Sequence, residues 1–158
     1  MRLLKKLFNK ILIGLDGSNP SKIALKYAAN LAFEQNAELY ILTVVPPLPV
    51  APFDETQLDY RPEMQEVFIL DYEKQLIKTV EDLKKTHSGL KSNPLLKEGN
   101  PATKIVETAK SIQVDLIVVG NRGTGDILTW MLGSVSRQVT ESCTVPVLVV
   151  KDQKYCEN

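Results

Sequence analysis

Short apolar runs alternate along this chain with longer amphipathic stretches, and this alternation is the feature that most limits its fold. Strands are predicted at residues 10–16, 38–45, 94–98, 116–119 and 145–150. Helices are predicted at 20–35, 63–86, about 101–112 and after Gly133 and Ser134. The alternation predicts parallel β-α-β units in an α/β fold: a three-layer, open, parallel five-stranded sheet with helices on both faces. Strand orders 3-2-1-4-5 and 2-1-3-4-5 both suit such a sheet.

The segment 116–139 contains the parts of an anion site. It opens with a buried strand, passes through Gly120, Gly123 and Gly125, and becomes helical after Gly133 and Ser134. Glycine lets backbone N–H groups come close to a ligand, and the first turn of a helix offers free N–H donors with a partial positive charge. The segment therefore predicts a phosphate site.

A second polar feature ends the first predicted strand. In open parallel sheets the ligand lies beyond the carboxyl ends of the strands, where the winding direction reverses. If the order is 3-2-1-4-5, the first and fourth strands flank that crevice. Asp16 ends the first strand and Gly120 ends the fourth, so this order predicts that the two features meet at one place.

Length and charge limit the function classes. The 158 residues suit one domain, and lysine plus arginine equals aspartate plus glutamate at 19 each, which leaves no overall field to attract nucleic acid. The apolar runs are too short for a membrane span. Cys143 and Cys156 have no metal-binding spacing and are predicted to be reduced thiols of a cytoplasmic protein. We predict a basic, frayed N-terminal extension at 1–9, one domain at 10–151 and a polar tail at 152–158.

Six fragments, taken in order, carry a family resemblance. They are KILIGLDGS at 10–18, ILTVV at 41–45, EGNPATKIVETAK at 98–110, VDLIVVGNRG at 114–123, LGSVSRQV at 132–139 and PVLVV at 146–150. The spacing Gly120-x2-Gly123-x9-Gly133-Ser134 resembles the nucleotide-binding signature of the universal stress protein family, in its ATP-binding branch. The chain departs from the family pattern at its N-terminus, where several extra residues precede the first strand.

The resemblance implies strand order 3-2-1-4-5 and a site for ATP or a related adenine nucleotide (ADP or AMP), with Mg²⁺ as an accompanying ion. It places the nucleoside against the ends of the first two strands and the phosphates on the glycine segment. The residues carried over are Gly14, Leu15, Asp16, Val44, Val119, Gly120, Gly123, Gly133, Ser134, Val135 and Ser136. A carboxylate suits a sugar hydroxyl, whereas beside a triphosphate it would repel. Ser134 is expected to cap the last helix and donate to phosphate at once.

Several other residues of the sequence allow two interpretations each. Arg122 could reach the terminal phosphate or extend into solvent, and both are open. Asp126 could help to hold Mg²⁺, although solvent or a loop cap is favoured. Trp130 suits an exposed anchor or packing on the last helix. His87 is interpreted as an incidental surface residue, and Cys143 as a small buried filler. The proline-rich stretch 46–62 suits a functional loop or a solvated linker.

Other phosphate-binding schemes fit less well. The chain has no G-x-x-x-x-G-K-[ST], and its glycines do not match G-x-G-x-x-G. A receiver domain would want a pair of acids after the first strand, where Asp16 stands alone. A flavodoxin-like site remains conceivable because Ser18 and Ser21 follow that strand, but nothing marks the aromatic residues that would bracket a flavin.

Three functions follow as hypotheses. The first is a nucleotide-binding regulatory module of a stress response, and the second is a slow ATPase or phosphotransferase. Fast phosphoryl transfer needs a positioned base, and the sequence offers no obvious one beyond Asp16, which is assigned to the sugar, so binding is favoured over turnover. The third is a ligand-free dimeric scaffold. The strand from Val145 to Val150 would be a sheet edge, and the resemblance implies homodimers through it.

Overall fold

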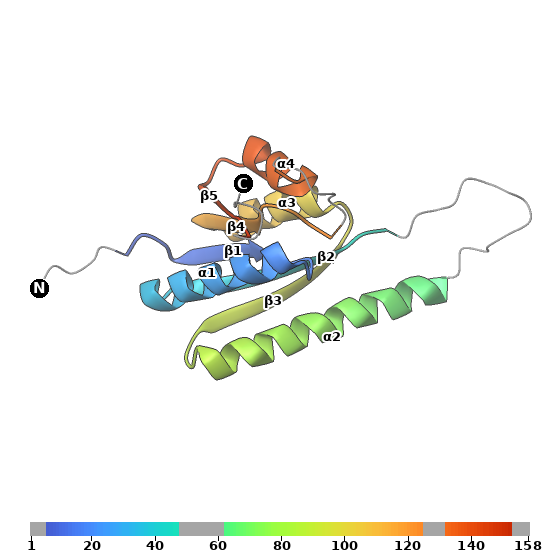
Figure 1. Cartoon of the computed structure of the whole chain (residues 1–158), viewed down its shortest axis with the longest axis horizontal. Helices are drawn as coiled ribbons and strands as arrows, with labels where there is room; N and C mark the ends of the chain where they lie inside the picture. The colour runs from blue at the N-terminus through green and yellow to red at the C-terminus, as the bar shows by residue number, and fades with distance from the viewer. Residues whose placement is uncertain (1–5, 48–61, 125–131, 153–158) are drawn as a thin grey trace, which may run out of the picture.

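The fold is a single five-stranded parallel sheet between two layers of helices, as Figure 1 shows. The computed structural model describes residues 6–47, 62–124 and 132–152. The elements are β1 (Lys10–Gly14), α1 (Asn19–Gln35), β2 (Glu38–Val45), α2 (Pro62–Thr86), β3 (Lys91–Glu98), α3 (Pro101–Ile112), β4 (Leu116–Gly120), α4 (Ser134–Ser142) and β5 (Val147–Val150). The sheet order is β3-β2-β1-β4-β5 with every pair parallel. The predicted fold class and the order 3-2-1-4-5 are confirmed, and the order 2-1-3-4-5 is excluded.

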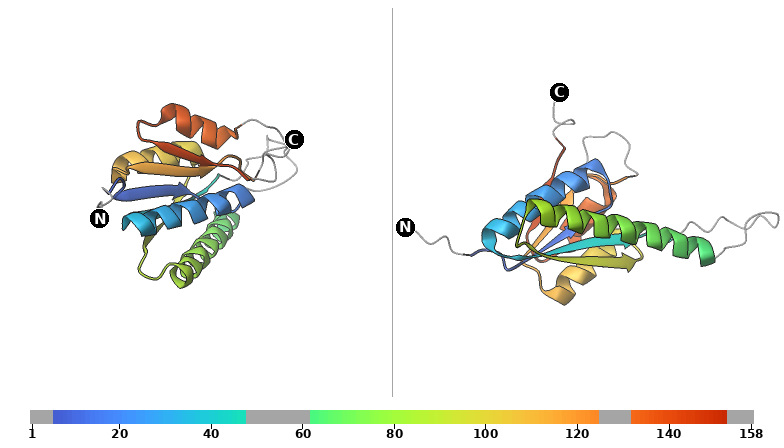
Figure 2. Two further views of the ribbon diagram at one scale, coloured as in Figure 1. Left: turned by 60° about the vertical axis from the view of Figure 1, so that its left-hand side comes forward. Right: turned by 90° about the horizontal axis from the view of Figure 1, so that it is seen from below.

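Strand alternation divides the core into two halves. On β1, Ile11 and Ile13 pack under α1 and α2, whereas Leu12 packs under α3 and α4. The same alternation runs through β2 and β4, which explains why the central strands read as continuous apolar runs. Figure 2 (left) shows the two helix pairs on opposite faces of the sheet. Helices therefore cover both faces, and in such a sheet a ligand site is expected at the carboxyl ends of the strands.

Strand β1 ends at Gly14 rather than Asp16, so Asp16 follows the strand instead of ending it. Two other strands begin at different residues than predicted, and a proline is involved in each. Strand β3 begins at Lys91 rather than Pro94, and it accepts Pro94 in its interior because it is an edge strand, where a missing N–H can face solvent. Strand β5 begins at Val147 rather than Val145, because Pro146 has no N–H to donate. Its carbonyl still accepts a hydrogen bond from the Ile117 amide at 3.0 Å.

The predicted frayed N-terminus is wrong for the part that the structure describes. Lys6 Nζ donates to the Asn36 carbonyl at 3.0 Å, and the Leu7 amide donates to Gln35 Oε1 at 2.8 Å. The side chain of Phe8 packs against the core cluster under α1. The segment 6–9 is thus tied to the carboxyl end of α1. Residues 1–5 lie outside the described residues.

The start of the predicted polar tail is also more integrated than expected. Asp152 is 5% exposed, and Asn19 Nδ2 donates to its Oδ2 at 2.5 Å. Asn19 is the first residue of α1, so the chain after β5 returns to the beginning of that helix. Composition alone gave no reason to bury this carboxylate. Residues 153–158 lie outside the described residues.

Candidate nucleotide site

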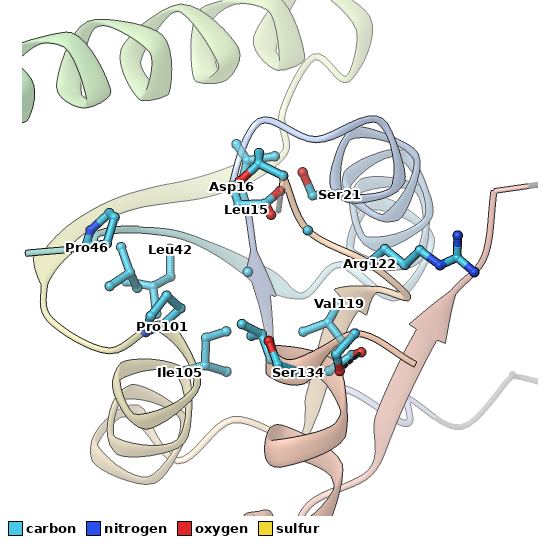
Figure 3. Close-up of a pocket in the computed structure, with 18 of the residues that line it drawn as sticks. Leu15, Asp16, Ser21, Leu42, Pro46, Pro101, Ile105, Val119, Arg122 and Ser134 are labelled. Atoms are coloured by element: carbon cyan, nitrogen blue, oxygen red, sulfur yellow. Dashed lines mark hydrogen bonds between the residues drawn. The ribbon is translucent and has the colours of Figure 1, made fainter. Parts of the chain in front are cut away.

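A cavity of about 320 Å³ opens at the carboxyl ends of the strands. Its size is in the range of small-molecule sites. All twelve residues that the sequence singled out line it: Gly14, Leu15, Asp16, Val44, Val119, Gly120, Arg122, Gly123, Gly133, Ser134, Val135 and Ser136. Figure 3 shows Leu15 and Asp16 on one side and Ser134 on another. The structure therefore brings the two halves of the predicted site together at the switch point between β1 and β4.

The β1 side of the cavity is organised by Asp16. One oxygen of its carboxylate accepts from the Ser18 amide at 3.0 Å and from Ser18 Oγ at 2.6 Å. Ser18 is in turn the N-cap of α1, and its Oγ accepts from the Ser21 amide at 3.3 Å. The start of α1 is thus capped from within the protein, and the same serine holds the Asp16 carboxylate at the cavity rim.

Two glycines at the end of β4 are close to α1 and to Asp16. A Cβ on Gly120 would lie 2.8 Å from the Pro20 carbonyl carbon and 2.8 Å from the Ser21 nitrogen, both backbone atoms. A Cβ on Gly123 would instead lie 2.8 Å from Asp16 Oδ2, the end of a flexible side chain. Gly120 is therefore needed for packing of the sheet on α1. Gly123 is needed to leave room for the carboxylate.

The start of α4 corrects one sequence prediction. The N-cap is Gly133, not Ser134, and it makes no side-chain cap hydrogen bond. Ser134 is the first helical residue and is exposed. The hydroxyl of Ser136 is 3.1 Å from the Asn121 carbonyl and 3.0 Å from that of Gly133, so it holds the glycine segment together rather than facing a ligand. The sequence prediction placed the cap one residue too late, because the N-cap is set by the residue at which the first helical turn begins, and the residue types did not fix that position.

Helix α4 nevertheless presents a polar end to the cavity. Among the helix starts whose caps the structure describes, α1 is capped by Ser18 and α3 by Asn100, whereas α4 has no side-chain acceptor. Gly133, Ser134, Val135 and Ser136 all line the cavity. An uncapped first turn supplies N–H donors and a partial positive charge, which suit a phosphate group.

Comparison with known proteins gives this arrangement a family. The family model described as "Universal stress protein family" matches residues 7–151. The chain belongs to the universal stress protein family. It is 38% identical over 148 residues to universal stress protein YxiE of Bacillus subtilis, an alignment that covers 92% of this chain and 100% of that protein.

Solved structures of universal stress proteins share the fold. UspA from Lactobacillus plantarum superposes with a TM-score of 0.73 at 23% identity, covering 90% of this chain and 97% of that one. A universal stress protein solved in complex with cAMP superposes with a TM-score of 0.63 at 26% identity, covering 91% of this chain and 97% of that one. The first likeness confirms the fold, and the second concerns a relative that holds an adenine nucleotide.

Part of the universal stress protein cavity was not found from the sequence. Its apolar wall includes Leu42 and Ile105, and Tyr72 of α2 also lines it. Leu42 shares a face of β2 with Val44, so the two-residue period of a strand could have identified it. No sequence pattern identified Tyr72. Helical periodicity shows which face of α2 carries it, but not which part of the protein that face packs against. Ser21, Pro46, Pro101 and Thr124 complete the lining.

Other singled-out residues lie elsewhere or outside the described part of the chain. In Figure 3 the side chain of Arg122 extends away from Leu15 and Ile105, although Arg122 lines the cavity. His87 is half-buried just after α2, its Nε2 is 2.8 Å from Asn30 Oδ1, and it does not line the cavity. It therefore joins α2 to α1. Gly125, Asp126, Trp130 and Cys156, and most of the stretch 46–62, lie outside the described residues.

Few titratable groups in the part of the chain that the structure describes line the cavity, and this limits the reactions that the site could support. Asp16 is the one carboxylate among the described residues that line the cavity. Within the described ranges no group of three or more metal-binding side chains gathers. Burial raises the pKa of the Cys143 thiol, which disfavours a reactive thiolate and suits a packing role beside α4. The arrangement can hold a sugar hydroxyl and an anion, and it offers one candidate proton acceptor.

None of the helices in the described ranges combines the length and the apolar character that crossing a bilayer requires.

Proposed function

We propose that this cavity binds an adenine nucleotide, ATP, ADP or AMP, and that the bound nucleotide regulates the protein in a stress response. The observation that carries the proposal is that the uncapped start of α4 opens into the same cavity as Asp16. Phosphates would lie on the first turn of α4, which has no side-chain cap. The ribose would lie against Asp16, whose carboxylate is held by Ser18.

The apolar part of the cavity suits the base. Leu15, Val44 and Ile105 are buried and come from the residue after β1, from β2 and from α3, so they form a fixed wall at the nucleoside end. The likeness to a universal stress protein solved with cAMP supports an adenine nucleotide as the ligand. Mg²⁺ would take most of its ligands from the phosphates and water, because Asp16 is the only lining carboxylate in the described part of the chain.

A pair of matched substitutions on one helix tests the proposal. Ser134→Asp places a negative charge at the first residue of α4, and Ser142→Asp places it at the last. By calorimetry, ATP should bind the wild-type protein and Ser142→Asp alike, and Ser134→Asp at least about tenfold more weakly, because the new charge repels phosphate. Equal loss in both variants, or no binding of ATP, ADP or AMP to the wild-type protein at millimolar concentration, would reject the site.

Slow turnover is compatible with this site, and fast turnover is not expected. Phosphoryl transfer needs an oriented nucleophile, and the one lining carboxylate is hydrogen-bonded to Ser18. We expect ATP loss by pure protein to be slow, and at ATP concentrations below the wild-type Kd we expect Ser134→Asp to lower any activity of the site at least about tenfold, in line with its weaker binding. Rapid turnover that Ser134→Asp leaves unchanged at such concentrations would indicate a contaminating enzyme, and rapid turnover that it lowers would make the protein an ATPase.

Dimerisation through β5 is the second part of the proposal. This strand ends the sheet, and Val147, Leu148 and Val149 are each only half-buried, so an apolar edge is available for pairing with a second copy. Sedimentation should find a dimer that Val149→Lys dissociates. Leu95→Lys on β3, at the opposite edge, should leave it intact. A dimer that survives the first substitution would place the interface elsewhere. A cytoplasmic location stays a prediction.

A further inference from the structure

A second cavity lies behind the nucleoside end of the candidate site. Its volume is about 110 Å³, and Leu15, Asp16 and Tyr72 line it as well as the first cavity. Its remaining lining residues come from α1, α2 and β2 and the turn before α1: Gly17, Lys22, Leu25, Thr43, Gln75, Leu76 and Thr79. The three shared residues therefore stand between the two spaces.

Tyr72 differs from the other two residues of this partition in how it is held. Leu15 and Asp16 follow β1 directly, so their places are fixed by the central strand and by Ser18. Tyr72 reaches the partition from α2, and its ring meets that of Phe68 edge to face at 4.9 Å between centroids. Helix α2 is anchored to the sheet by Leu76 and Val80, both buried. The ring is thus a fixed part of the wall rather than a loop group.

We propose that Tyr72 sets the depth of the nucleoside end and so determines which adenine nucleotides fit. With the ring present, the second cavity is closed off, and the site takes nucleotides whose base and ribose carry no bulky substituent. Without the ring, the two cavities join and bulkier nucleosides fit. The inference rests on the proposed nucleotide site, and it adds a specificity-determining residue that contacts ligand from outside the strand ends and the glycine segment.

The chemistry of the partition supports this role. The proposed ribose position is beside Asp16, and Asp16 is itself one of the three shared residues, so a nucleoside bound there would lie next to the partition. The space behind it is polar on several sides, with Lys22, Thr43 and Gln75 in its lining. A substituent that entered it would find hydrogen-bond partners as well as room. Rejection of such a substituent is then steric and depends on the Tyr72 ring.

The test measures selectivity rather than affinity alone. The probes are ATP, N6-benzyl-ATP, which is enlarged on the base, and N-methylanthraniloyl-ATP, which is enlarged on the ribose hydroxyls. Wild-type protein should prefer ATP to both analogues by at least about tenfold. Tyr72→Ala should reduce that preference by about tenfold for at least one analogue, whereas Tyr72→Phe, which keeps the ring, should match wild type.

Two further variants separate the steric role from general damage. Ile77→Ala removes an apolar side chain that is 48% exposed on the same helix and lines neither cavity, so it should leave all three affinities unchanged. Tyr72→Leu keeps an apolar side chain and serves if the alanine variant does not fold. It should relax the preference in the same direction. Melting curves without ligand show which variants are folded.

The outcomes are distinguishable from failure of the site itself. If wild-type protein binds none of the three probes, the proposed nucleotide site is wrong and this inference falls with it. If ATP binds and Tyr72→Ala and Tyr72→Leu weaken all three probes equally, or leave the preference unchanged, the nucleotide site stands and the role of Tyr72 is rejected. A wild-type protein that accepts both analogues as well as ATP also rejects it.

Discussion

Helices α1 and α4 both begin at the rim of the same cavity, but their first turns are completed differently. Helix α1 is capped by Ser18, whose Oγ accepts from the Ser21 amide and donates to Asp16. Helix α4 begins at Gly133 without a side-chain cap. A capped start is stable by itself and offers little to an anion, whereas an uncapped start keeps its donors for a ligand. One helix start thus supports the cavity and the other is proposed to bind.

Among the substitutions that test this difference between α1 and α4, Gly120→Ala should change the stability of the protein most. The added Cβ would lie 2.8 Å from backbone atoms of Pro20 and Ser21, so β4 and the start of α1 must separate. Overpacking of this kind costs about 1–3 kcal/mol of unfolding free energy, which in a domain of this size lowers Tm by about 2–4 °C per kcal/mol. Thermal and chemical denaturation measure it, and an unchanged Tm would show that the contact is easily relaxed.

Ser18→Ala should have the next largest effect. Removing the cap of α1 costs about 1 kcal/mol. It also removes the 2.6 Å hydrogen bond that holds Asp16, so we expect weaker nucleotide binding as well. Asn100→Ala is the matched control, because Asn100 caps α3 in the same way through the Thr103 amide at 3.1 Å and does not line the cavity. It should lower stability by a similar amount without changing affinity; equal loss of affinity in both would remove the role given to Ser18.

Gly123→Ala should weaken nucleotide binding strongly while changing the stability of the protein little. Its added Cβ meets only the end of the Asp16 side chain, which can move, so the loss of unfolding free energy should stay below about 1 kcal/mol. Nucleotide affinity should fall by at least about tenfold, because a displaced carboxylate no longer meets the ribose. Calorimetry beside a melting curve gives both quantities. A large loss of Tm with unchanged affinity would assign Gly123 to packing, as for Gly120.

Gly133→Ser should have the smallest effect on stability, and in the opposite direction. The backbone at Gly133 has φ −63°, an ordinary value for any residue, and serine is a good N-cap, so unfolding free energy should rise by a few tenths of a kcal/mol. Nucleotide binding should weaken several-fold because the new hydroxyl occupies donors of the first turn. Tighter binding in this variant would contradict the proposed role of the uncapped start.

The sequence predicted the fold and the lining of the site to an unusual extent because both depend on local patterns. Strand β2 and helix α3 begin and end where the residues indicated, since apolar periodicity, Gly99 and Pro101 act within a few positions. The glycine spacing and Asp16 converge because parallel strands end at one edge of the sheet. Errors arose where a boundary depends on a neighbour, as in the cap of α4.

The sequence by itself determined the alternation of elements, the two-sided core and the residues at the ends of β1 and β4. Tertiary structure alone decided that Tyr72 of α2 lines the same two cavities as Asp16, and that Asp152 is buried beside Asn19. The physical reason is the separation in the chain of the residues that interact. Periodicity, capping propensity and turn residues express interactions within one element, whereas a partition between two cavities exists only once elements distant in the chain have packed together.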